Sequence, residues 1–72
     1  LGQVYLALGD YPKAKSRLTV AVRLEPKRAE YRYSLCLANE KLGDKEGARY
    51  QCQAALKLKP DYKEAEEVLK RL

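Results

Sequence analysis

The chain repeats itself at an offset of 34 residues without needing an insertion. Of the 38 residue pairs that this offset compares, ten are identical, among them Leu8-Gly9-Asp10 with Leu42-Gly43-Asp44. A period of this length is typical of stacked helical hairpins, in which each unit contacts only its neighbours. The repeat therefore predicts an all-α solenoid of antiparallel helical hairpins, and it leaves the binding target to surface residues that the repeat does not specify.

Size and charge limit what this solenoid can be. A chain of 72 residues is one small unit, which buries only about 60% of its unfolded surface. Its net charge of +5 raises the possibility of an anionic partner. However, Lys13, Lys15, Arg17 and Arg23 point in scattered directions around one helix and are followed by acids. We therefore read them mainly as solvated positions and do not expect nucleic acid as the partner.

The ends and the apolar runs of the chain say little about its location. The longest apolar run covers residues 4–8, far fewer than the roughly 20 residues that span a membrane. The chain starts at Leu1 in the middle of a repeat, so we expect a piece of a larger protein. The compartment is left open, with the cytoplasm favoured.

Two cysteines, Cys36 and Cys52, occur in a chain without histidine and without a CxxC spacing, so we expect no metal site and no cofactor. A disulfide between them is sterically conceivable because they lie on neighbouring helices of one hairpin. Small buried thiols are nevertheless common in helical cores. The prediction is that both thiols are reduced and buried.

Helix boundaries follow from glycine, aspartate and proline. Gly43 supplies a positive φ angle that ends one helix, and Asp44 caps the next, as Gly9 and Asp10 do one repeat earlier. The resulting prediction is five helices near residues 2–8, 12–24, 28–42, 45–58 and 62–71, with Asp61 and Glu64 as a capping box for the last. Gly47 opposes this pattern, because glycine inside a helix costs up to about 1 kcal/mol relative to alanine.

Apolar residues follow the helical period on these segments. Tyr31, Leu35, Ala38 and Leu42 share one face of the third segment. In the second and fourth segments the core positions correspond across the repeat: Ala14, Leu18, Ala21 and Val22, then Ala48, Cys52, Ala55 and Leu56. The alanines among them allow helix axes to approach closely.

These residues resemble the tetratricopeptide repeat family. The turn residues Gly43 and Asp44, the small residues Ala48 and Ala55, and the closing Pro60 stand where the family's 34-residue pattern places them. The complete repeat departs from the pattern at Arg32, Cys36, Asn39 and Cys52. The resemblance divides the chain into a partial repeat (1–28), a complete repeat (29–62) and a further helix (63–72) that either opens another repeat or caps the array.

The resemblance implies a non-catalytic scaffold of a larger protein that binds a peptide or a partner helix in a concave groove. The groove positions carried over to this chain are Gln3, Leu6, Ala7, Glu30, Tyr33, Ser34, Leu37, Glu40, Lys41, Glu64, Glu67, Val68 and Arg71. Some members hold a C-terminal carboxylate with a clamp of asparagine, lysine and arginine. Here Ser34, Glu64 and Val68 stand at those positions, so that clamp is absent.

Two further expectations concern partners. Because the array begins within a hairpin, its ends should expose apolar side chains and promote self-association. RNA binding is the alternative function, since related helical repeats read one base each. Catalysis is not expected, because the chain has no histidine and neither cysteine has an evident base partner.

Overall fold

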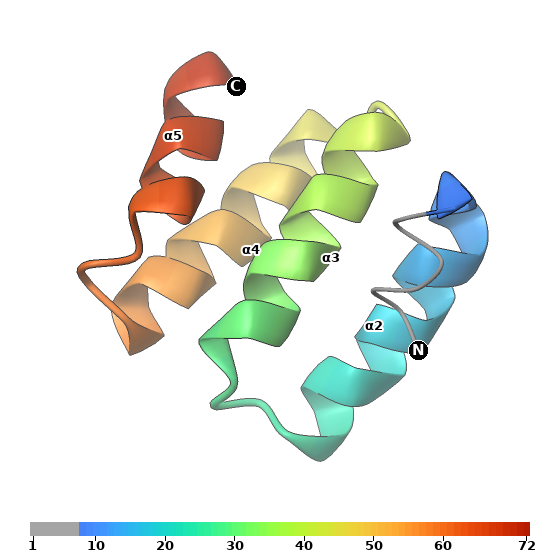
Figure 1. Ribbon diagram of the computed structural model, residues 1–72, viewed down its shortest axis with the longest axis horizontal. Helices are drawn as coiled ribbons and strands as arrows, with labels where there is room; N and C mark the ends of the chain where they lie inside the picture. The colour runs from blue at the N-terminus through green and yellow to red at the C-terminus, as the bar shows by residue number, and fades with distance from the viewer. Residues whose placement is uncertain (1–7) are drawn as a thin grey trace.

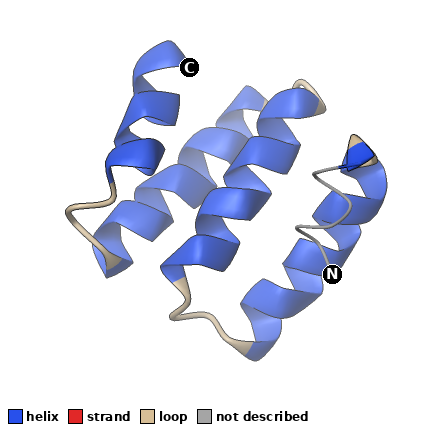
Figure 2. Ribbon diagram, viewed as in Figure 1, coloured by secondary structure: helices blue, strands red, loops and turns tan. Residues whose placement is uncertain are grey.

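A computed structural model describes residues 8–72 of the chain. It contains the helices α2 (Tyr11–Leu24), α3 (Ala29–Lys41), α4 (Lys45–Leu58) and α5 (Lys63–Arg71), and no strand occurs in this part of the chain (Figures 1 and 2). These bounds agree within one residue with the predicted segments 12–24, 28–42, 45–58 and 62–71. The predicted first helix, residues 2–8, lies outside the described residues except for Leu8.

Each helix packs against the next one along the chain: α2 on α3, α3 on α4, and α4 on α5. In Figure 1, α3 lies between α2 and the remaining helices, α4 runs behind α3, and α3 and α5 point in the same direction. This arrangement is that of antiparallel hairpins stacked side by side, and it confirms the predicted fold class.

The predicted turn chemistry is present at both helix starts that follow a glycine. Gly9 and Gly43 have φ angles of +79° and +85°, a region that residues with a Cβ atom rarely occupy. The Asp10 carboxylate then accepts from the Lys13 amide at 3.4 Å, and the Asp44 carboxylate accepts from the Gly47 amide at 2.9 Å. The capping box predicted for α5 is wrong: Tyr62 stands at the N-cap and makes no side-chain cap.

The core contains two groups of buried side chains. The smaller group joins α2 to α3 and consists of Ala14, Leu18, Leu35 and Ala38. The larger group joins α3, α4 and α5 and consists of Ala29, Cys36, Ala48, Cys52, Ala55, Tyr62, Ala65 and Val68. The alanines at the predicted contact positions of α4 are fully buried, which brings the neighbouring helices close. Leu42, predicted on the core face of α3, is 42% exposed instead.

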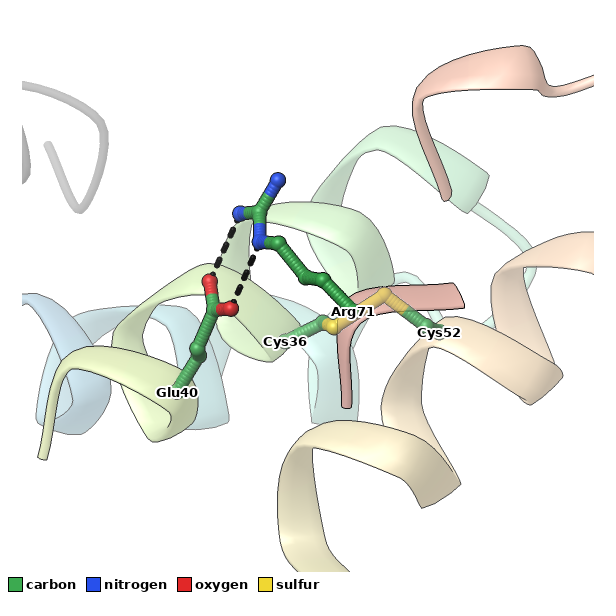
Figure 3. The surroundings of a disulfide bond; sticks show 4 residues. All are labelled: Cys36, Glu40, Cys52 and Arg71. Carbon is green, nitrogen blue, oxygen red and sulfur yellow. Dashed lines mark hydrogen bonds and ion pairs between the residues drawn. A yellow bond between two sulfur atoms is a disulfide. The ribbon is translucent and has the colours of Figure 1, made fainter. Parts of the chain in front are cut away.

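The prediction of reduced thiols is wrong. Cys36 and Cys52 form a disulfide across the α3–α4 hairpin, with their Cα atoms 5.4 Å apart, and the described residues contain no free cysteine (Figure 3). Their predicted burial is confirmed, since both side chains are fully enclosed. Both cysteines are departures from the family pattern, and they face each other, so a covalent bond joins the helices where side-chain packing would otherwise do so.

Another departure also has a partner in the structure. Arg32 on α3 donates from Nη1 to Oε1 of Gln51 on α4 at 3.2 Å. Asn39 is buried at the end of α3. Arg32, Cys36 and Cys52 therefore support the hairpin by polar and covalent contacts in place of aromatic packing.

Gly47 is explained by the cap that precedes it. A Cβ atom at this position would lie 2.8 Å from Cγ of Asp44 and 3.1 Å from Nδ2 of Asn39. The glycine therefore leaves room for the Asp44 carboxylate to cap α4, which was not evident from helix propensity alone. The apparent conflict in the sequence is a packing requirement.

Replacing Gly47→Ala should destabilise the protein by roughly 0.5–1 kcal/mol, because the loss of a cap outweighs the gain in helix propensity at a first-turn position. Urea denaturation measures the change. In an Asp44→Ala background the same substitution should become neutral or stabilising, since no carboxylate remains to be displaced. A stabilising effect in the wild-type background would contradict this account.

Candidate functional site

Two parallel helices present the predicted groove residues that the structure describes. Glu30, Tyr33, Leu37 and Glu40 follow one another at steps of three and four along α3, so they share one side of that helix. Glu64, Glu67 and Arg71 do the same on α5. We call these seven residues the α3/α5 face.

An aromatic pair joins α3 to the start of α5. The rings of Tyr33 and Tyr62 lie 5.1 Å apart between centroids and are tilted by 42°, a favourable arrangement for two aromatic rings. Tyr62 is 8% exposed, and Nζ of Lys59 lies 4.9 Å from its ring centroid. This pair fixes the N-terminal end of α5 beside α3.

Carboxylates surround this aromatic pair. Burial raises the pKa of the Tyr33 phenol, and the negative charges of Glu64, Glu67 and Glu40 raise it further against an opposing effect of Arg71. Burial likewise raises the pKa of Tyr62, with additional contributions from Glu30 and Glu64. Both phenols therefore stay neutral at physiological pH, in a negative local environment.

The opposite end of the α3/α5 face contains an ion pair between the two helices. Arg71 donates from Nε and Nη2 to the two carboxylate oxygens of Glu40, each at 2.7 Å (Figure 3). The Glu40 side chain is 18% exposed and that of Arg71 is 53% exposed. The hydrogen bond from Arg71 is the main cause that lowers the pKa of Glu40. One of the four acids predicted in the groove is thus already neutralised.

The remaining predicted groove residues fall into three groups. Ser34 and Val68 are 5% and 1% exposed, so they line the interior between helices. Lys41 is exposed beside Glu40. Leu37, which belongs to the α3/α5 face, is half-buried against the larger core group. Gln3, Leu6 and Ala7 lie outside the described residues.

Tyr62 is the residue of this site that the sequence reading missed. Its counterpart one repeat earlier is Arg28, so the repeat gives no sign of an aromatic residue at this position. Arg28 contacts a ring of its own, with Cζ 5.4 Å from the centroid of Tyr31. The contact between Tyr62 and Tyr33 depends on how α5 folds back, which neighbouring residues do not specify.

Positive charge is concentrated on the other two helices. Together, α2 and α4 carry seven lysine and arginine residues and one acid, a balance of +6, whereas α3 and α5 each carry equal numbers of both signs. The scattered cations noted in the sequence are therefore segregated from the α3/α5 face. The local charge of the α3/α5 face is negative, whereas the net charge of the chain is positive. Three acids of this face take part in none of the ion pairs found among residues 8–72: Glu30, Glu64 and Glu67.

Residues 8–72 contain no group of three or more potential ligands that could hold a metal ion. Within the same range, no helix has the length and apolar character of a membrane span.

The geometry defines the class of protein: an α-solenoid built from helical hairpins, with Gly-Asp turns and proline stops at a fixed period. A sequence model of the tetratricopeptide repeat family matches residues 1–63, and the chain belongs to this family. Repeats of this family generally serve as protein-interaction scaffolds. No curated protein matches the chain.

Proposed function

We propose that the α3/α5 face binds a protein segment that is apolar in the middle and basic at its edges. The observation that carries this proposal is the position of Tyr33 and Leu37 among carboxylates, three of which have no ion-pair partner among the described residues. Neither Tyr33 nor Leu37 is fully buried, so each retains surface for a ligand.

The two kinds of residue would play different parts in binding. Desolvated aromatic and aliphatic contacts supply most of the affinity in protein interfaces. Charges at the rim mainly raise the association rate and select partners by sign. We therefore expect most of the affinity to come from Tyr33 and Leu37. The preference for a basic segment would come from Glu30, Glu64 and Glu67.

An acidic C-terminal peptide fits this surface poorly. Of the three positions of the family's carboxylate clamp, Ser34 and Val68 are buried and Glu64 is an acid. A ligand carboxylate would approach Glu64 and Glu67 without a lysine or arginine at those positions to receive it. The charge of the face thus favours the opposite kind of ligand.

The Tyr33→Ala variant should bind such a segment more weakly by over about 1 kcal/mol, because it removes the central aromatic contact. A suitable probe is a fluorescein-labelled peptide with four apolar residues between paired arginines, followed by fluorescence anisotropy. Glu64→Lys should mainly slow association and reduce its salt dependence.

Tyr50→Ala provides the matched control, because Tyr50 lies on α4 and is 64% exposed. Its affinity for the peptide should equal that of the wild type. The proposal fails if Tyr50→Ala weakens binding as much as Tyr33→Ala does, or if an acidic peptide binds as well as the basic one.

RNA binding is the second candidate, and the balance of +6 on α2 and α4 is the observation in its favour. Phosphate contacts would make the affinity fall steeply with salt. Filter binding of a single-stranded RNA over a range of salt concentrations therefore separates the two candidates.

Self-association stays a prediction. Among the described residues, the exposed apolar side chains near the start of the array are those of Leu8, Val20 and Leu24.

A further inference from the structure

Glu40 differs from the other acids of the α3/α5 face in that it already holds a guanidinium group. Both of its carboxylate oxygens accept from Arg71 at 2.7 Å, and Figure 3 shows the two groups facing each other across the space between α3 and α5. Paired hydrogen bonds between ionised groups of this kind are among the strongest in proteins. The acid is also the more enclosed partner, with 18% of its side chain exposed.

A basic ligand would offer Glu40 the same chemical group that Arg71 offers. Because Arg71 already engages both oxygens, an arginine of the ligand can make the same paired contact with this carboxylate only if it displaces Arg71. Glu30, Glu64 and Glu67 present no such competition, since none of them takes part in the ion pairs of residues 8–72. The acids that remain available lie on the first half of α5 and at the start of α3.

Glu30 and Glu40 are separated along the axis of α3. Ten residues separate Glu30 from Glu40 on α3, which corresponds to about 15 Å at a rise of 1.5 Å per residue. An extended ligand covers this distance with roughly four to five residues, and a helical ligand with about ten. The spacing between two cations of one peptide therefore determines whether the peptide contacts one end of the face or both.

We propose that Arg71 is a specificity-determining residue that occupies Glu40 and confines recognition of a ligand's cations to Glu30, Glu64 and Glu67. This inference rests on the proposed binding of a basic segment. It refines that function, because the unmodified face would gain no affinity from a second cation placed near Glu40.

Two sets of labelled peptides test the assignment by fluorescence anisotropy. The one-ended peptide carries paired arginines followed by apolar residues, and the two-ended peptides add an arginine five or ten residues further on. Wild-type protein should bind both kinds within about twofold. Arg71→Ala should bind one of the two-ended peptides about five- to tenfold more tightly than wild type, as expected for one new charged hydrogen-bonding contact, while the one-ended peptide is unaffected.

Control variants separate competition from a structural effect. Glu40→Gln combined with Arg71→Ala should lose the gain, because no carboxylate remains for the added arginine. Arg71→Met keeps the apolar part of the side chain and should reproduce the gain if Arg71→Ala loosens α5. Lys70→Ala removes a neighbouring charge that takes no part in the Glu40 contact, and should leave both affinities unchanged.

The outcomes distinguish this inference from the function on which it depends. If wild type binds the one-ended peptide but neither Arg71 variant gains affinity for the two-ended peptides, the role of Arg71 is overturned and the binding face stands. If wild type binds none of the peptides, the proposed function fails and the role of Arg71 fails with it.

Discussion

Reducing the Cys36–Cys52 disulfide should lower the free energy of unfolding by about 3 kcal/mol, mainly because the unfolded chain is then no longer closed into a loop. The two cysteines are 16 residues apart in sequence, which sets the size of that loop. Both sulfur atoms are enclosed between α3 and α4, so after reduction the thiols move apart but stay in the core as small apolar groups. Small domains have only about 5–15 kcal/mol of stability in total, so the cross-link contributes a large share.

Urea denaturation with and without dithiothreitol measures this difference. A Cys36→Ala/Cys52→Ala variant is the matched control, because its unfolding transition should not respond to the reductant. Thiol titration of the denatured protein in the absence of reductant gives an independent check. Two reactive thiols per chain in that titration would show that the bond does not form.

Replacing Tyr62→Ala should cost about 3 kcal/mol, as expected for truncating a large buried aromatic side chain. Tyr62 is 8% exposed, packs on Tyr33, and belongs to the core group that holds α5. Tyr62→Phe retains the ring and should lose much less. The loss should concentrate at α5, since this helix has only nine residues and packs mainly on α4.

Amide hydrogen exchange checks where the structure opens. In Tyr62→Ala, the amides of residues 63–71 should exchange much faster, whereas those of α3 should change little. Ligand affinity should fall as well, because Glu64 and Glu67 are placed by α5. Unchanged protection of α5 would mean that the aromatic pair does not hold this helix.

Much of the fold could be predicted from short stretches of sequence. Gly43 and Asp44 end one helix and start the next through contacts within five residues, and Pro26 and Pro60 follow closely after the ends of α2 and α4. Such local interactions form in any short segment with the same residues, whatever the rest of the fold. The four described helices were therefore predicted to within one residue.

Contacts between distant residues were not predictable in the same way. The spacing of Cys36 and Cys52 allows both a disulfide and two free thiols, and only the packing of α3 on α4 places their Cα atoms 5.4 Å apart. Glu40 and Arg71 are 31 residues apart and meet because α5 runs parallel to α3. Gly47 illustrates the same limit, since its requirement comes from the side chain of Asp44 and not from helix propensity.

For the candidate site, the family register predicted Glu30, Tyr33, Leu37, Glu64 and Glu67 as groove positions. The three acids are exposed, whereas Tyr33 and Leu37 are partly buried against the core. The register could not separate these residues from Ser34 and Val68, which the stacking of α5 buries. Register gives the direction of a side chain within its own helix. The neighbouring helix then determines whether that direction leads to solvent.

The disulfide also changes how the chain would respond to mechanical tension. A pulling force applied to the two ends can unravel α2 and α5, but the segment between Cys36 and Cys52 lies outside the force-bearing path once the bond carries the load. The loop closed by the bond, which spans a sequence separation of 16, then remains unextended and withholds roughly 50 Å of contour length at about 3.3 Å per residue. Oxidised and reduced chains of identical sequence would therefore stretch to different lengths before breaking.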